Sequence, residues 1–154
     1  MDLKSFLDPE AIRFVPQVSS KKRLLQDISE QAAGLYGLDA GVVLSALIDR
    51  EKLGSTGVGR GVAIPHARFE ELDRVYGFFT RIEQPVDFES MDRQPVDLVF
   101  TILAPQREGA DHLKALAVVS RTLRSENNCT NLRANSDEKA LYALLTQEDK
   151  NRAA

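Results

Sequence analysis

The sequence predicts an α/β fold in which a mixed sheet is flanked by helices. The chain has 154 residues, of which 43% are hydrophobic, so it is long enough for one domain with an ordinary core. Helical patterns stand at both ends of the sequence, and strand-like segments lie between them. We therefore expect a single domain over residues 1–154, with a core over about 6–146 and a tail at 147–154.

The amino-terminal third predicts one strand and two helices. Residues 12–15 can form an edge strand. Ser19 or Ser20 can cap a helix that runs to about Tyr36, and Asp39 can cap a second helix that ends near Lys52. The apolar side of the first helix is expected to consist of Leu24, Leu25, Ile28, Ala32 and Leu35. The inner stripe of the second is expected to contain Val43, Ala46, Leu47 and Arg50.

The middle of the chain predicts the sheet. Strands are expected at residues 62–64, 75–82 and 96–103, with turns at 84–88 and 91–95. The segment 96–103 is nearly continuous in β-forming residues, which is typical of a strand covered on both faces. The sheet should therefore be built around this segment.

The carboxyl-terminal part predicts three helices. A loop at 105–110 leads to Asp111, which can cap a helix. The inner positions of that helix are expected to be Leu113, Leu116, Ala117 and Leu123. Two shorter helices are expected near 128–133 and at 136–145.

Charge and composition exclude several classes of protein. A net charge of −3 and a pI of about 5.4 argue against non-specific nucleic-acid binding, which needs a basic surface. Cys129 is the single cysteine, so an internal disulfide is impossible and a reducing compartment is favoured. The first residues lack a signal-peptide pattern, and no run approaches the roughly 20 apolar residues that cross a bilayer. We expect a cytoplasmic protein without membrane insertion.

A glycine-dense loop at residues 54–61 is the first candidate site. Such a loop can bring backbone amides close to an anion, and Ser55 and Thr56 could add their hydroxyl groups. The candidate phosphate-binding residues are Ser55, Thr56, Gly57 and Gly59. The alternative is that the glycines only permit a tight turn. A P-loop would need lysine and a hydroxyl residue at Arg60 and Gly61, and a dinucleotide fingerprint would need glycine at Val62.

Two histidines and one arginine are the other candidates. His66 follows the loop and a stiff Pro65, and a neutral imidazole can attack phosphorus as a nucleophile. His112 stands at the start of a predicted helix, where the helix dipole favours an anion. Arg50 continues an inward-facing stripe, so its guanidinium needs a partner such as a phosphoryl group.

Each of these residues also has a purely structural interpretation. His66 could be a core or surface histidine, and His112 could be a surface residue of a first helical turn. Arg50 could reach solvent or pair with Glu51 or another carboxylate. Two histidines and one cysteine are too few for a convincing zinc site, and no nucleophile-elbow pattern surrounds Ser55. We therefore expect no metal and no cofactor.

Two segments resemble a known family. The stretch 50–66, which reads REKLGSTGVGRGVAIPH, closely resembles the active-site segment of the mannitol/fructose-type IIA proteins of the bacterial phosphoenolpyruvate-dependent phosphotransferase system. The stretch 109–116 looks like the second-histidine segment of that family. The similarity extends from about Ser19 to Leu145. The start of the first helix and the length of the chain look most like the nitrogen-regulatory branch of the family.

The resemblance implies a fold and roles for the three residues. The implied fold is a mixed, mostly parallel sheet between helices. His66 matches the histidine that receives the phosphoryl group on its ε nitrogen, His112 matches the histidine that stabilises the group, and Arg50 matches an arginine that neutralises its charge. One departure is Ala67-Arg68, where many members of the nitrogen-regulatory branch carry Gly-Lys; it preserves the positive charge but puts an identical docking surface in doubt.

Three functions remain open. The leading hypothesis is a phosphohistidine carrier that receives its phosphoryl group from an HPr-like carrier protein and acts as a regulatory switch. Its implied partners include potassium-transport and sensor-kinase proteins. The alternative is a IIA component of fructose or mannitol uptake that passes the group to a IIB domain. The third is a binding module whose loop holds a phosphorylated ligand without covalent transfer.

Overall fold

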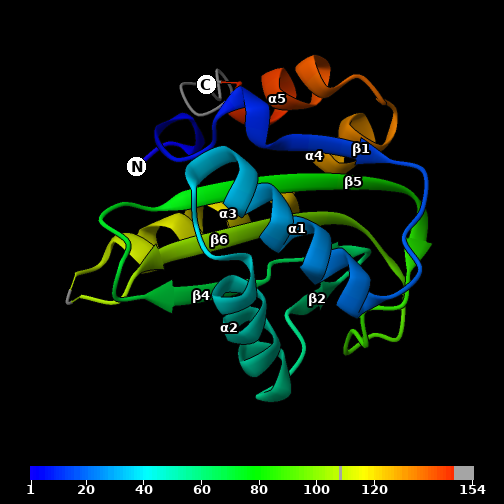
Figure 1. Ribbon diagram of the computed structural model, residues 1–154. Helices are drawn as coiled ribbons and strands as arrows, with labels where there is room; N and C mark the ends of the chain where they lie inside the picture. The colour runs from blue at the N-terminus through cyan, green and yellow to red at the C-terminus, as the bar shows by residue number, and fades with distance from the viewer. Residues whose placement is uncertain (108, 148–154) are drawn as a thin grey trace.

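A six-stranded mixed sheet forms the centre of the protein (Figure 1). The computed structural model describes residues 1–107 and 109–147, so most of the expected tail at 147–154 lies outside the described residues. The strand order is β1-β5-β6-β3-β2, and β4 pairs with β6 beyond the end of β3. The strands are β1 (Ile12–Val15), β2 (Gly57–Gly59), β3 (Val62–Ala63), β4 (His66–Phe69), β5 (Tyr76–Val86) and β6 (Val96–Pro105).

Helices cover both faces of this sheet (Figure 1). Helix α1 crosses in front of it, and α3 and α4 lie behind it. The helices are α1 (Lys21–Tyr36), α2 (Ala40–Lys52), α3 (Asp111–Arg124), α4 (Glu126–Arg133) and α5 (Glu138–Thr146), with 3-10 turns at Leu3–Ser5 and Pro9–Ala11. The predicted single α/β domain with a mixed, flanked sheet is confirmed. Three of the five strand pairings are parallel, but the longest, between β5 and β6, is antiparallel.

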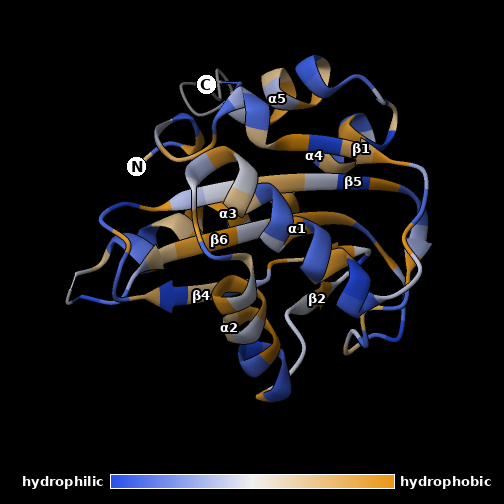
Figure 2. Ribbon diagram, in the orientation of Figure 1, coloured by the Kyte–Doolittle hydropathy of each residue, from blue (hydrophilic) through white to orange (hydrophobic). Residues whose placement is uncertain are grey.

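The two amino-terminal helices begin at the predicted caps. Ser20 rather than Ser19 caps α1, because its Oγ accepts a hydrogen bond from the backbone N–H of Arg23 at 3.0 Å. Asp39 caps α2 in the same way, through the N–H of Val42 at 3.1 Å. The expected apolar side of α1 is buried, with Leu35 partly so. Polar residues on the outward side of α1 appear blue in Figure 2.

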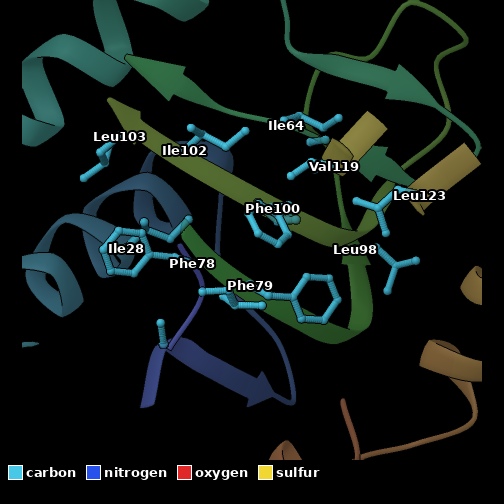
Figure 3. Packing of buried hydrophobic residues seen from close by; sticks show 14 of the residues in the cluster. Ile28, Ile64, Phe78, Phe79, Leu98, Phe100, Ile102, Leu103, Val119 and Leu123 are labelled. Atoms are coloured by element: carbon cyan, nitrogen blue, oxygen red, sulfur yellow. The ribbon is translucent and has the colours of Figure 1, made fainter. Parts of the chain in front are cut away.

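The core gathers around β5 and β6. Phe78, Phe79 and Phe100 are fully buried, and Phe100 packs against Phe79 with ring centroids 6.3 Å apart. Figure 3 shows these rings among side chains from α1 and α3, which confirms that β6 is covered on both faces. Every residue of β6 except Asp97 is buried, as its run of β-forming residues predicted.

Two strands were not predicted, and one was predicted too short. Strand β2 lies inside the glycine loop, and β4 begins at His66. Strand β5 continues to Val86 through part of the turn expected at 84–88. Its ladder with β6 is irregular between Arg81 and Val86, and such an irregular stretch tolerates Pro85.

The prediction for α3 was wrong in two respects. Asp111 is the first residue of the helix and not its cap, which is Ala110. The buried face consists of Ala115, Val119 and Leu123, whereas Leu113 is 60% exposed and Ala117 is also exposed. The helix is rotated about its axis relative to the prediction, so that Ala115, Val119 and Leu123 face the sheet and the first turn lies at the surface. Ser125 and Asp137 cap the last two helices, so α4 begins two residues before its expected start.

No helix in the ranges 1–107 and 109–147 is long and apolar enough to span a bilayer.

Candidate functional site

A cavity of about 580 Å³ lies where α2, β4, β6 and α3 meet. It brings together the three side chains singled out from the sequence, Arg50, His66 and His112. Apolar residues form most of the remaining wall, among them Ala46, Leu53, Ile102, Leu113 and Leu116. Figure 1 shows why segments far apart in the sequence converge here: α2 lies beside β4.

The backbone holds the ring of His66 in one orientation. His66 is the first residue of β4 and pairs with Ile102 of β6. Its Nδ1 lies 2.9 Å from the carbonyl oxygen of Ile64. Because a carbonyl only accepts hydrogen bonds, Nδ1 must carry the hydrogen. In the neutral ring, Nε2 therefore carries the lone pair, and Nε2 is the nitrogen that faces Arg50.

The surroundings of His66 favour its neutral form. Burial is the largest cause that lowers the pKa of His66 below its usual 6.5, and the positive charge of Arg50 and the nearby His112 lower it further. The hydrogen bond to Ile64 and the carboxylate of Glu51 act in the opposite direction without reversing the shift. Near neutral pH the ring is therefore uncharged and nucleophilic.

We expect this lowered pKa to appear in a titration of the His66 ring. A histidine in an unfolded peptide titrates near 6.5, whereas His66 should stay neutral until the pH falls below that value. Nitrogen-15 NMR of the ring measures the midpoint directly. Any reaction that uses the neutral ring should begin to slow at a lower pH than it would with a histidine of ordinary pKa. A midpoint above 6.5 would contradict this account.

Arg50 reaches the same ring from the last turn of α2. Its Nε lies 3.3 Å from Nε2 of His66 and donates to it, and its Nη1 donates to the carbonyl of Gly54 at 2.9 Å. The alternative that Arg50 pairs with Glu51 does not describe this structure, since the carboxylate of Glu51 contacts Lys21 instead. The guanidinium therefore stands beside the nucleophilic nitrogen.

His112 lines the same cavity from the first turn of α3. It is the second residue of α3, and no described side chain caps that helix. The first amides of α3 and the positive end of its dipole therefore lie at the wall that carries His112. An anion bound near His112 would be stabilised by these amides and by the helix dipole.

The glycine loop does not line the cavity. Thr56 is buried and donates its N–H and its hydroxyl to the carboxylate of Glu51. Ser55 Oγ donates to the carbonyl of Phe88 and accepts from the N–H of Gly57. The four residues expected to bind phosphate, Ser55, Thr56, Gly57 and Gly59, are therefore not among those that line the cavity.

Two residues that the sequence analysis mentioned, but did not count among its candidate site residues, also contribute. Arg68 lies two residues after His66 on β4, so both side chains are on one side of the strand and line the cavity. Recognising β4 as a strand would have revealed this alternation. Glu51 is the other, and its partners on α1 and in the loop are brought together only by the fold.

The described residues contain no group of three histidine, cysteine or acidic side chains placed to hold a metal. Asp49 is the one acidic residue among those that line the cavity, against Arg50 and Arg68. The chemistry available here consists of a neutral imidazole, a second imidazole and two guanidinium groups. This set suits a phosphate-like anion.

Comparison with known proteins assigns the chain to a family. The model of the family described as "Phosphoenolpyruvate-dependent sugar phosphotransferase system, EIIA 2" matches residues 5–148. The chain belongs to this family. It is 49% identical over 145 residues to the nitrogen regulatory protein of Bradyrhizobium diazoefficiens, covering 94% of this chain and 95% of that one.

Solved structures agree with this membership. The crystal structure of the nitrogen regulatory protein IIA-Ntr from Neisseria meningitidis has a TM-score of 0.86 at 34% identity, over 92% of this chain and 97% of that one. The IIA mannitol structure from Escherichia coli has a TM-score of 0.75 at 24% identity, over 90% and 97% of the two chains, and shows the shared fold. The resemblance deduced from residues 50–66 and 109–116 is confirmed, and the EIIA 2 chain is a component of a phosphotransfer system.

Proposed function

We propose that this EIIA 2 chain is a phosphohistidine carrier that accepts a phosphoryl group on Nε2 of His66. One observation carries the proposal: Nδ1 of the ring donates to the carbonyl of Ile64, so the unprotonated Nε2 is presented beside Arg50 at the cavity. The donor is an HPr-like carrier protein, whose own phosphohistidine docks against the mouth of the cavity.

The transfer is a displacement at phosphorus. The lone pair of Nε2 attacks in line, the new P–N bond forms, and the bond to the carrier's histidine breaks with its electron pair returning to the carrier. The hydrogen stays on Nδ1, which continues to donate to the carbonyl of Ile64. His66 therefore neither gains nor loses a proton. Once Nε2 is bonded to phosphorus it no longer accepts from Arg50, whose Nε–H becomes free to donate to a phosphoryl oxygen.

The remaining groups of the cavity stabilise the charge on the transferred group. His112 lines the cavity at the start of α3, whose first amides are available there, and Arg68 adds a second guanidinium to the lining. The three oxygens of a phosphoryl group can then be shared among donors from α2, β4 and α3. No metal is needed in this scheme.

Regulation follows from the change in charge. Phosphorylation adds roughly two negative charges to a cavity that holds two arginines, so partner proteins meet a different surface in the two states. Similar proteins carry the name nitrogen regulatory protein, which supports a role in nitrogen regulation. We extend this role to potassium regulation. Potassium-transport and sensor-kinase proteins are the proposed targets.

The test is to incubate the protein with a phosphorylated HPr-like carrier and to follow the phosphoryl group by phosphorus NMR and mass spectrometry. We expect one acid-labile, alkali-stable phosphoryl group per chain, bonded to Nε2 of His66. Label on His112 or on a hydroxyl group, or no label at all, would overturn the proposal. Offering the labelled protein a IIB domain of a fructose or mannitol system separates the sugar-uptake alternative, which requires rapid passage of the group to that domain.

A further inference from the structure

We propose that Glu51 is a positioning residue that holds the His66 ring and Arg50 in register through Thr56. The inference rests on the function proposed above, because it concerns the same site. Glu51 does not line the cavity. It follows Arg50 in the last turn of α2, and its side chain enters the protein behind the glycine loop.

The carboxylate of Glu51 is buried and fully engaged. Its side chain is only 7% exposed. One oxygen, Oε1, accepts the N–H of Thr56 at 3.0 Å and lies 3.0 Å from Nζ of Lys21. The other, Oε2, accepts the hydroxyl of Thr56. A buried carboxylate with this many donors is held in one place, and it holds its partners in turn.

The contacts continue from Thr56 to the reacting ring. The carbonyl of Thr56 accepts the N–H of Ile64 at 3.0 Å, and the carbonyl of the same Ile64 accepts Nδ1–H of His66 at 2.9 Å. Glu51 therefore lies at the start of a chain of hydrogen bonds that ends on the ring. That chain determines which nitrogen of His66 carries the hydrogen, and hence that Nε2 is the nucleophile.

The same residue also steadies the guanidinium. The N–H of Gly54 donates to the backbone carbonyl of Glu51 at 3.1 Å, and the carbonyl of Gly54 accepts Nη1 of Arg50. Gly54, whose carbonyl accepts from Arg50, is thus held in place by its hydrogen bond to the backbone of Glu51. A shift of Glu51 would move both the ring and the guanidinium, which must stay aligned for in-line transfer.

Lys21 gives Glu51 its counter-charge. Its side chain is 15% exposed, and Nζ lies 4.5 Å from the centroid of the Phe88 ring. A positive charge in the first turn of a helix is repelled by the positive end of the helix dipole. The ion pair with Glu51 offsets this repulsion and explains why a lysine stands in the first turn of α1. The charged or titratable groups around His66 are Asp49, Arg50, Glu51, Arg68 and His112.

The main experiment replaces Glu51 by glutamine in the full chain. Glu51→Gln removes the negative charge that pairs with Lys21 and turns the charge-assisted bonds from Thr56 into weaker, neutral ones. We expect the maximal rate of transfer to fall about 10- to 100-fold while KM for the carrier stays unchanged, since Glu51 does not line the cavity. Nitrogen NMR should show part of the neutral His66 ring with its hydrogen on Nε2. The pKa of His66 should fall further, because Glu51 acts to raise it.

Glu89→Gln is the matched control. Glu89 is the second carboxylate near Lys21, at 3.8 Å, but it is 76% exposed and donors of the glycine loop do not reach it among the contacts described. This variant removes the same charge from the same lysine partner. We expect Glu89→Gln to have the same transfer rate and the same His66 tautomer as the unaltered chain. If Glu89→Gln and Glu51→Gln behave alike, charge alone is responsible and the positioning role is wrong.

Thr56 provides a second and milder test. Thr56→Val removes the hydroxyl bond but keeps the backbone N–H, and Thr56→Ser restores the hydroxyl. We expect Thr56→Val to slow transfer, Thr56→Ser to recover most of it, and the double variant with Glu51→Gln to be little slower than Glu51→Gln alone. Additive losses would mean that Thr56 acts independently of Glu51, which would overturn the proposal.

The ring tautomer separates this inference from the function on which it rests. Nitrogen NMR measures the tautomer without any phosphoryl donor. The role of Glu51 can therefore be tested even if the chain never accepts a phosphoryl group. An unchanged tautomer and an unchanged rate in Glu51→Gln would refute the positioning role. A shifted tautomer in a protein that the carrier does not label would support the positioning role and refute the proposed function.

Discussion

Replacing His66 by alanine is expected to abolish covalent phosphorylation. Among the described residues that line the cavity, His66 is the one whose lone pair is free of hydrogen and held in one direction by the backbone, through Ile64. Without it, the phosphoryl group has no nitrogen beside Arg50 to attack it. We expect His66→Ala to fold, because the side chain is only partly buried, and to carry no acid-labile label after incubation with the phosphorylated carrier.

His112→Ala is the control for this experiment. His112 lines the cavity without a defined hydrogen-bond partner among the described side chains, so it can stabilise the group but is not held as a nucleophile. We expect His112→Ala to take up one label per chain, at a rate no more than about tenfold lower than that of the unaltered chain. Full labelling of His66→Ala, at His112 or at any other residue, would remove the central role of His66.

Replacing Arg50 by glutamine is expected to slow transfer by about 10²- to 10³-fold. The loss corresponds to removing one preorganised donor for charge that develops during the reaction. Glutamine keeps a polar group at the end of α2 but lacks the charge and the paired N–H groups of the guanidinium. The pKa of His66 should rise in Arg50→Gln, since the positive charge of Arg50 lowers it.

Two further variants separate charge from geometry. Arg50→Lys keeps the charge but loses the planar fork, so its rate should lie between those of Arg50→Gln and the unaltered protein. Arg23→Gln removes an arginine that pairs with Asp27 on the surface of α1, and it should change nothing. Single-turnover labelling at saturating carrier measures all four rates. Equal rates for Arg50→Gln and Arg23→Gln would show that Arg50 takes no part in transfer.

Local signals in the sequence were sufficient for the long elements. Ser20 and Asp39 identified the starts of α1 and α2, because a side-chain oxygen before an apolar stripe satisfies amides that a helix leaves free. The nearly continuous run of β-forming residues in β6 identified the centre of the sheet. These signals are contained within a few residues, so no knowledge of the rest of the chain was needed.

Two of the short strands were beyond such signals. Strands β2 and β4 have three and four residues, and each exists because a neighbouring strand supplies its hydrogen bonds. A pattern of alternation cannot be recognised over so few positions. The rotation of α3 has a similar cause, since the face that packs on β6 is decided by where the sheet lies and not by which apolar residues the helix contains.

The sequence by itself supplied the candidate groups of the site: an imidazole, a second imidazole and an arginine, in segments whose order and spacing identify the family. The tertiary structure decided how they act. It keeps the glycine loop out of the cavity, bonds Thr56 of that loop to Glu51, and turns Nε2 of His66 toward Arg50. The physical reason is that the direction of a lone pair depends on hydrogen bonds between distant segments, which only the folded chain brings within reach.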